Sequence, residues 1–147
     1  MTEVYSEGAH LIGEVLYKLT KDLNIEAIGG PAVGAIPLTT ATVISYYRHG
    51  QLLKGFWVQN KIKTDGTQKI IEGDFIDGLR VAIVDDVLTK GMSALRAVEI
   101  VQKLGCEVVT VLALVDRLQG ARELFQSHGI KNYRCVFTIK DFGIDPV

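Results

Sequence analysis

Residues 81–93 of this chain read Val81-Ala82-Ile83-Val84-Asp85-Asp86-Val87-Leu88-Thr89-Lys90-Gly91-Met92-Ser93. The first four residues are apolar and mostly β-branched, which is typical of a strand buried on both faces of a parallel sheet. Two adjacent carboxylates follow, and a turn with Thr, Gly and Ser comes behind them. Apolar residues then recur at helical spacing up to position 104. The segment predicts a strand, a turn and a helix, which begin a βαβ unit of an α/β fold.

The two carboxylates and the turn together predict one kind of ligand. Ligands of parallel sheets bind beyond the carboxyl ends of the strands, where Asp85 and Asp86 fall. Free backbone N–H groups at the start of the next helix bind anions. Because carboxylates repel a bare phosphate, we expect them to accept hydrogen bonds from the hydroxyls of a sugar on the same ligand. The predicted fragment is a ribose 5-phosphate, and the alternative for an acidic pair alone is a solvated turn.

Bulk properties narrow the class of protein. The chain has 147 residues, of which 48% are hydrophobic, and a net charge of −1. This length and composition predict one compact domain. No apolar run approaches the roughly 20 residues of a membrane span, no signal peptide is visible, and the charge does not favour nucleic acid. Cys106 and Cys135 are expected to be free thiols in a reducing cytoplasm. His10, His49 and His128 lack metal spacing, which favours exposed or capping roles.

The remaining elements follow from periodicity and from glycine turns. The sequence predicts helices over residues 8–22, 35–47, 93–104 and 118–128, and strands over residues 25–28, 56–58, 81–84, 108–115 and 133–139. Residues 61–73 are polar and predict a mobile loop or ribbon. A second glycine turn, residues 29–34, follows the first strand. If the two strands are neighbours, both turns open onto one crevice and this turn can bind a second anion such as pyrophosphate. The alternative for this turn alone is an ordinary connection between a strand and a helix.

Residues 85–93 resemble the signature of the type I phosphoribosyltransferases, in which two acidic residues and a Thr/Gly/Ser turn grip phosphoribosyl pyrophosphate. Lys90 and Met92 replace the small residues usual there. Further stretches resemble the orotate phosphoribosyltransferases: residues 30–38 their pyrophosphate loop, residues 63–67 and 71–73 their catalytic loop, residues 115–117 a strand ending in an orotate-contacting arginine, and residues 137–139 their closing strand. The resemblance spans about residues 7–142.

This resemblance implies a mostly parallel central sheet flanked by helices, with a mobile catalytic loop. Residues 1–147 would be a single phosphoribosyltransferase domain that lacks most of the family's N-terminal hood, and a shortened reading frame is one explanation for that. The implied reaction transfers the phosphoribosyl group from phosphoribosyl pyrophosphate to orotate, giving orotidine 5′-monophosphate and pyrophosphate, in pyrimidine nucleotide biosynthesis. The resemblance also implies Mg²⁺ and a homodimer that shares the catalytic loop across its interface.

The resemblance assigns roles to four groups of residues. The catalytic residues would be Lys63, Asp85 and Asp86, and orotate would be bound by Thr89 and Arg117. The pyrophosphate loop would consist of Pro31, Ala32, Val33 and Gly34. Phosphoribosyl pyrophosphate would be bound by the segment Asp85, Asp86, Val87, Leu88, Thr89, Lys90, Gly91, Met92 and Ser93. Mg²⁺ would be held mainly by the substrate, with no direct protein ligand assigned.

The loop departs from the family pattern at three positions. Gln59, Asn60 and Asp65 stand where the family has an Arg-Lys pair and a histidine. Loss of these positive or protonatable groups predicts weaker handling of pyrophosphate, because charges a few ångströms apart interact by about 1 kcal/mol even in water. Lys61 and Lys69 are candidates to compensate. Two alternatives therefore stay open: a regulator that binds phosphoribosyl pyrophosphate or a nucleotide with weakened catalysis, and a type I enzyme for another base.

Overall fold

The computed structural model describes residues 4–60 and 70–147. In chain order, its elements are α1 (Ser6–Thr20), β1 (Ala27–Pro31), α2 (Ala35–Arg48), β2 (Lys54–Val58), β3 (Ile71–Gly73), β4 (Arg80–Leu88), α3 (Met92–Lys103), β5 (Glu107–Asp116), α4 (Ala121–Ser127), β6 (Tyr133–Thr138) and the 3₁₀ helix η2 (Ile139–Phe142). The strands form one sheet in the order β3-β2-β1-β4-β5-β6. Only β3 runs antiparallel to its neighbour, which confirms the predicted α/β class with a mostly parallel sheet.

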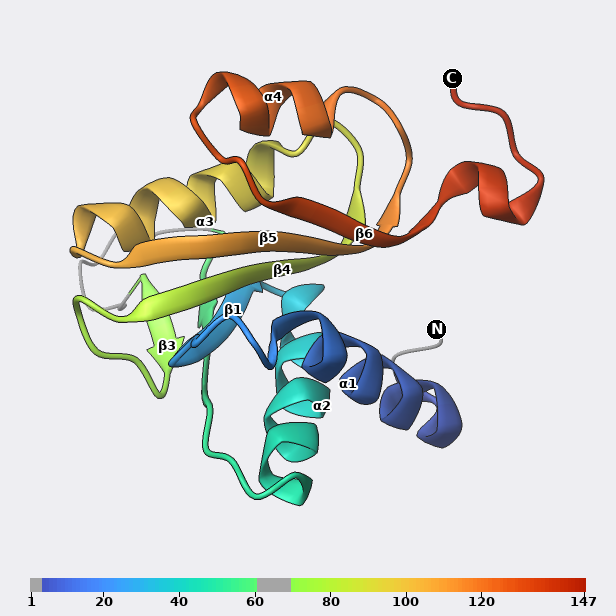
Figure 1. The fold of residues 1–147 in the computed structure, drawn as a ribbon. Helices are drawn as coiled ribbons and strands as arrows, with labels where there is room; N and C mark the ends of the chain where they lie inside the picture. The colour runs from blue at the N-terminus through green and yellow to red at the C-terminus, as the bar shows by residue number, and fades with distance from the viewer. Residues whose placement is uncertain (1–3, 61–69) are drawn as a thin grey trace.

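Helices cover both faces of the sheet, with α1 and α2 on one side and α3 and α4 on the other (Figure 1). Successive side chains of a strand point to opposite faces. Val81 and Ile83 of β4 therefore pack in the core beneath α3 and α4, while Ala82 and Val84 pack in the core beneath α1 and α2. The unbroken apolar run at residues 81–84 is thus explained by burial on both faces, as its composition predicted.

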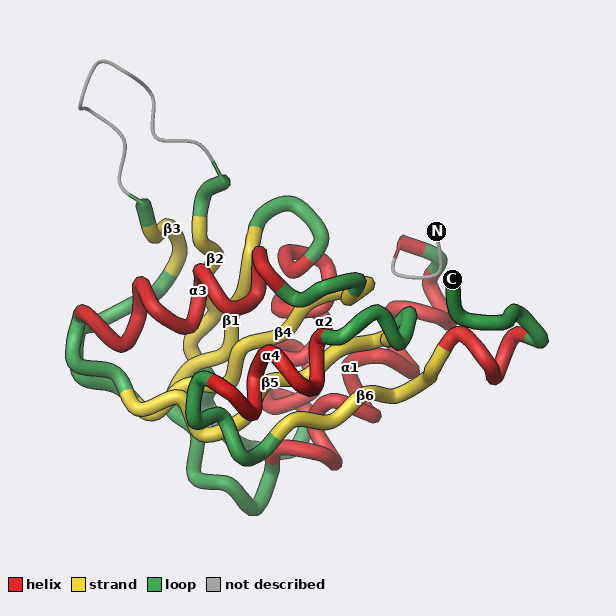
Figure 2. Tube along the Cα trace, turned by 90° about the horizontal axis from the view of Figure 1, so that it is seen from above, coloured by secondary structure: helices red, strands yellow, loops and turns green. Residues whose placement is uncertain are grey.

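The strand order places a crevice between β1 and β4. After β1 the chain turns to β2 on one side, whereas after β4 it turns to β5 on the other (Figure 2). Such a reversal point is where ligands of open α/β sheets bind, outside the carboxyl ends of the strands. Pairing between β1 and β4 stops at Gly29 and Ile83. The rest of β4 continues past β1 and forms one wall of the crevice.

Two predicted boundaries at this crevice are wrong. β1 continues to Pro31, so the first half of the predicted turn at residues 29–34 is strand. Its glycines allow the strand to lie very close to its neighbours: a Cβ on Gly30 would stand only 1.8 Å from the carbonyl oxygen of Val84. β4 continues to Leu88 because β5 pairs with it as far as that residue. The acidic pair is therefore part of the strand, three and two residues before its last residue, rather than just after the strand.

Three further elements differ from the predictions. α4 starts at Ala121 instead of position 118, because Leu118 and Gly120 adopt left-handed backbone angles that interrupt a right-handed helix. The end of the predicted loop or ribbon forms β3, antiparallel to β2. Ile139 belongs to η2 rather than to the last strand, and the Asp141 side chain caps that 3₁₀ helix. The other helices and strands match their predicted bounds within two residues.

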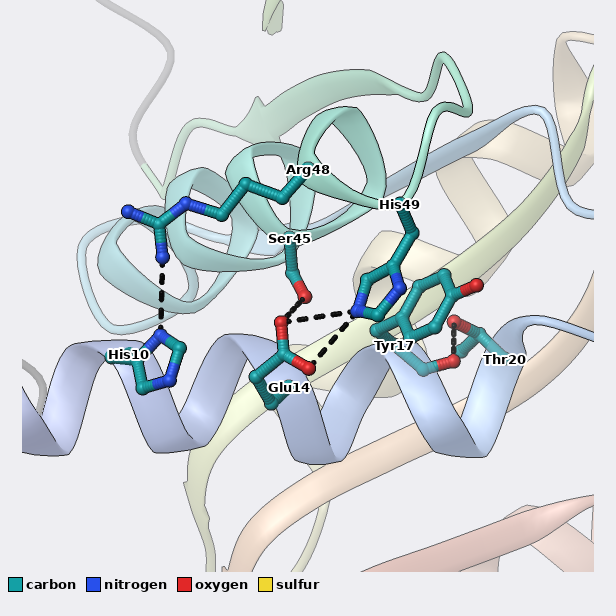
Figure 3. Close-up of polar contacts among 7 residues, drawn as sticks. All are labelled: His10, Glu14, Tyr17, Thr20, Ser45, Arg48 and His49. Atoms are coloured by element: carbon teal, nitrogen blue, oxygen red, sulfur yellow. Dashed lines mark hydrogen bonds and ion pairs between the residues drawn. The ribbon is translucent and has the colours of Figure 1, made fainter.

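Polar side chains join α1 to α2 beside their apolar contact (Figure 3). The Glu14 carboxylate accepts hydrogen bonds from Ser45 Oγ at 2.6 Å and from His49 Nε2 at 3.0 Å. These two bonds lower the pKa of Glu14. The His49 ring stacks on Tyr17 with 4.0 Å between ring centroids. His49 therefore links two helices at the surface, in agreement with the exposed role predicted for it.

Candidate functional site

The acidic pair on β4 combines one buried and one partly exposed carboxylate. Asp85 is 7% exposed and accepts a hydrogen bond from the backbone N–H of Asp86 at 2.9 Å. The Asp86 carboxylate accepts the backbone N–H of Val87 at 2.7 Å. Burial, followed by the neighbouring Asp86 carboxylate, raises the pKa of Asp85 to about 7. Asp85 is therefore divided between its protonated and ionised forms near neutral pH, and a ligand can shift that balance.

The turn behind the acids ends in a free helix N-terminus. Gly91 has a φ of 83°, a left-handed angle that glycine adopts without steric cost. Its carbonyl accepts the N–H of Leu95 at 2.9 Å, so the N–H groups of the first residues of α3 have no partner within the helix. A cavity of about 210 Å³ lies here, lined by Asp85, Val87, Leu88, Thr89, Lys90, Gly91, Met92 and Ser93. Unpaired N–H groups facing a small cavity suit a phosphate.

Met92 has a larger side chain than the small residue usual at this position of the turn, and a larger side chain there could fill the cavity. Its side chain is 61% exposed, so most of it faces solvent. The predicted phosphate turn therefore keeps its cavity despite the larger side chain.

The two predicted turns meet in one crevice. A Cβ on Gly34 would lie 2.4 Å from Asp86 Oδ1, so the carboxylate rests directly against the Gly34 backbone. The turn is also tied to β2, since the N–H of Ala32 donates to the Val58 carbonyl at 2.8 Å. The Ala32–Val33 peptide bond is cis. The turn after β1 and the acidic pair therefore lie in contact, as expected if the strands that carry them are neighbours.

The predicted orotate residues lie at neighbouring strand ends. Leu88, the last residue of β4, pairs with Asp116, the last of β5. The backbone N–H of Arg117 donates to the Leu88 carbonyl at 2.9 Å. Thr89 and Arg117 therefore follow directly after paired residues, and the structure places both beside the turn that lines the phosphate cavity.

The start of the predicted catalytic loop is anchored from two directions. The side-chain amide of Asn60 donates to the carbonyl of Ala32 in the turn after β1. Arg96, on α3, donates from Nη1 to the Gln59 carbonyl at 2.9 Å. Arg96 was not predicted to be near the site, because only the packing of α3 brings it to the end of β2. Lys63 and Asp65, like Lys61 and Lys69, lie outside the described residues.

The donors at the crevice fit Mg²⁺ that arrives with a phosphorylated ligand. Asp85 and Asp86 supply carboxylate oxygens, and Mg²⁺ binds one or two carboxylates together with substrate phosphates and water. Within residues 4–60 and 70–147, no three His, Cys, Asp or Glu side chains are grouped to hold a metal ion. A dense cage of protein ligands is therefore not offered by the described part of the chain.

Another cavity lined by described residues is larger than the one at the candidate site. It measures about 830 Å³, lies between β3 and α3, and is lined mainly by apolar side chains (Ile70, Ile71, Phe75, Ile100 and Leu104). The cavity at the end of β4 is smaller, but carboxylates, free N–H groups and the strand-end Arg117 lie in or beside it. These groups match the chemistry of a sugar phosphate, whereas the larger cavity is distinguished only by its size.

The remaining predicted side chains have ordinary structural positions. His10 and His128 are exposed, as expected. Cys106 is buried, Cys135 is half-buried, and both are free thiols. None of the helices in the described ranges is long and apolar enough to cross a membrane.

Comparison with known proteins identifies the family. Residues 2–146 match the family model described as "Phosphoribosyl transferase domain". Orotate phosphoribosyltransferase from Streptomyces avermitilis is 40% identical over 139 residues, which cover 95% of this chain and 76% of that protein. The protein of the same name from Rhodopirellula baltica is 40% identical over 149 residues, covering 97% of this chain and 77% of that protein.

Solved structures agree with the sequence comparison. The crystal structure of Mycobacterium tuberculosis orotate phosphoribosyltransferase in complex with phosphoribosyl pyrophosphate has a TM-score of 0.84 and 35% identity to this chain, and the match covers 97% of this chain and 80% of that one. A phosphoribosyltransferase from Corynebacterium diphtheriae has a TM-score of 0.85 and 32% identity, with 97% and 86% covered. The chain therefore belongs to the phosphoribosyltransferase family and, within it, to the orotate phosphoribosyltransferases.

Proposed function

We propose that this protein transfers the phosphoribosyl group from phosphoribosyl pyrophosphate to orotate, forming orotidine 5′-monophosphate and pyrophosphate in pyrimidine nucleotide biosynthesis. One observation carries the proposal: the acidic pair, the Gly91 turn, the Gly34 turn and the residue after β5 converge on one crevice. The names of the similar proteins, and the ligand named for the M. tuberculosis structure, support the same reaction.

The reaction separates charge, and the acidic pair is suited to one side of that separation. Breaking the bond between C1 of the ribose and the pyrophosphate oxygen leaves positive charge on the sugar and negative charge on the leaving group. Asp85 and Asp86 accept hydrogen bonds from the ribose diol and stabilise the positive sugar. The backbone N–H groups around Gly91 bind the 5′-phosphate. C1 then forms its new bond to a ring nitrogen of orotate, and that nitrogen loses its proton to water.

The leaving group and the base are assigned to the other walls of the crevice. The turn Pro31, Ala32, Val33 and Gly34 binds the pyrophosphate, and Lys63 neutralises its charge. When bound, Mg²⁺ supplies further positive charge to the diphosphate. Arg117 pairs with the orotate carboxylate through two parallel hydrogen bonds, a geometry that a planar guanidinium favours. Thr89 contacts the base from the neighbouring strand end.

We also propose that the protein acts as a cytoplasmic homodimer in which the segment containing Lys63 serves the partner's site. Mass measurement in solution tests the oligomeric state. Mixing a Lys63→Ala variant with an Asp85→Asn, Asp86→Asn variant tests the sharing: two inactive parents should yield mixed dimers with activity. Mixtures that stay inactive while forming dimers would contradict a shared loop.

The direct test is orotate-dependent release of pyrophosphate from phosphoribosyl pyrophosphate with Mg²⁺, accompanied by a panel of purine and pyrimidine bases. We expect turnover with orotate and loss of turnover in Lys63→Ala. The regulator alternative draws support from the neutral Gln59 and Asn60 at the loop entrance. Tight binding of phosphoribosyl pyrophosphate without turnover on any base would favour that alternative, and turnover on a purine would reassign the substrate.

A further inference from the structure

We propose that Asp116 and Tyr133 are positioning residues that hold Arg117 in place for the base. This inference rests on the proposed function, in which Arg117 receives the orotate carboxylate. Neither residue was assigned a role from the sequence: Asp116 appeared only as a neighbour of Arg117, and Tyr133 only as the start of a strand.

Asp116 is a buried carboxylate whose two oxygens are both used. It is 2% exposed. Its Oδ1 accepts the backbone N–H of Leu118 at 2.7 Å, and its Oδ2 accepts the hydroxyl of Tyr133 at 2.7 Å. Burying a carboxylate costs free energy unless it is hydrogen-bonded, so this arrangement needs both donors. The carboxylate thereby fixes the backbone immediately after Arg117.

The turn that carries Arg117 is strained and needs this support. Leu118 has a φ of 58°, a left-handed conformation that is unfavourable for a non-glycine residue. The hydrogen bond from its N–H to Asp116 offsets that cost. On the other side, the N–H of Arg117 is held by the Leu88 carbonyl at 2.9 Å. Arg117 thus stands between two anchored peptide units, and the direction in which its side chain leaves the backbone is set by both.

Tyr133 is in turn held in position by α4. It is 8% exposed, with its ring centroid 5.1 Å from that of Phe125 and 5.0 Å from the Arg122 guanidinium carbon. Burial and the neighbouring Asp116 carboxylate raise the pKa of Tyr133, so its hydroxyl remains a donor. The chain of contacts runs from α4 through Tyr133 and Asp116 to the backbone at Arg117. Removing the hydroxyl would leave Asp116 Oδ2 buried without its donor.

The first variant is Tyr133→Phe, which keeps the ring and removes only the hydroxyl. Steady-state kinetics should show KM for orotate raised about three- to tenfold, the factor expected for one lost hydrogen bond. KM for phosphoribosyl pyrophosphate should stay within twofold of wild type. The matched control is Tyr46→Phe, which removes another buried hydroxyl, one that lies 2.8 Å from Thr20 Oγ1 between α1 and α2. It should lower stability without changing either KM.

A pair of substitutions at Asp116 separates positioning from charge. Asp116→Asn keeps an acceptor for the Leu118 N–H and can donate its amide to the Tyr133 hydroxyl, so KM for orotate should stay close to wild type. Asp116→Ala removes both bonds, and its KM for orotate should exceed that of Tyr133→Phe. If Asp116→Ala does not fold, the comparison of Tyr133→Phe with Tyr46→Phe still decides the question.

The outcomes distinguish this inference from the proposed function. If wild-type protein fails to convert orotate at all, the proposed function is wrong and the positioning role fails with it. If wild type is active but Tyr133→Phe has unchanged KM for orotate, only the positioning role is overturned. Equal increases in both KM values would mean that Tyr133 merely stabilises the fold, which also overturns the positioning role.

Discussion

Asp85 is the residue whose environment departs most from what its sequence position suggests. An exposed strand-end carboxylate would stay ionised at neutral pH, whereas burial raises the pKa of Asp85 to about 7. An ionised Asp85 binds the hydroxyls of a diol better, because a carboxylate accepts hydrogen bonds that a protonated acid accepts poorly. Burial of the ionised Asp85 carboxylate therefore costs folding free energy, although the ionised form is the one that binds the diol.

This environment predicts a pH-dependent cost in stability. Because the folded-state pKa is raised above the ordinary 3.8, the folded protein binds the proton more tightly, and stability falls as the pH rises from about 4 to 7. Asp85→Asn removes that cost. Between pH 5 and pH 8 the free energy of unfolding of the variant should gain about 2 to 3 kcal/mol on wild type in urea titrations.

The control for this measurement is Asp145→Asn, which removes an exposed carboxyl near the C-terminus. A difference between Asp85→Asn and wild type that stays constant with pH would show that Asp85 does not titrate in this range.

At the scale of elements, the site is made by how closely two strands and a turn approach each other. The turn after β1 can rest against the Asp86 carboxylate only because Gly34 has no side chain. Similarly, Gly30 allows β1 to lie against the Val84 carbonyl. The glycines were recognised as turn residues from the sequence, but their main role is to let the backbones approach.

Gly34→Ala should therefore harm binding more than folding. The new Cβ would stand 2.4 Å from Asp86 Oδ1 and must displace the carboxylate or the turn. We expect KM for phosphoribosyl pyrophosphate to rise about tenfold or more, since overpacking costs roughly 1 to 3 kcal/mol. Gly50→Ala is the control, because its Cβ meets no atom within 4 Å although its φ of 76° makes the substitution strained. If both variants lose stability equally and keep wild-type KM, the close contact has no role in binding.

At the scale of the whole molecule, the two cores on either side of the sheet support one crevice at its edge. The segments that line the crevice come from the ends of different strands. Ligand binding should therefore stabilise the complete fold and not one element. Phosphoribosyl pyrophosphate at a hundredfold excess over its Kd, with Mg²⁺, should raise the free energy of unfolding by about 2.7 kcal/mol. Thermal unfolding with and without the ligand measures this gain.

The variant carrying both Asp85→Asn and Asp86→Asn provides the comparison for this experiment. It should lose most of the gain, because the ribose diol loses its carboxylate partners. An undiminished gain in the double variant would remove the acidic pair from the binding site and leave the helix N-terminus at Gly91 as the principal contact.

The sequence was sufficient for the features that depend on neighbouring residues. The unbroken apolar run at residues 81–84 predicted a strand covered on both faces, and the Thr/Gly/Ser turn before an amphipathic stretch predicted the start of α3. Local backbone preferences and side-chain spacing carry this information, so it can be recognised without the fold. The sequence also predicted the acidic pair as a ligand site and connected it with Arg117 through a family resemblance.

Other features arise only when distant segments pack together. The extension of β4 through Asp86 requires β5 beside it, the raised pKa of Asp85 requires burial, and the bond between Tyr133 and Asp116 joins residues from two strands. Each depends on distances between segments that are far apart along the chain, and hydrogen bonding and desolvation act over only a few ångströms. Residue order therefore identified the groups that can bind a sugar phosphate, while packing determined which of them meet, how they are charged and what holds them in place.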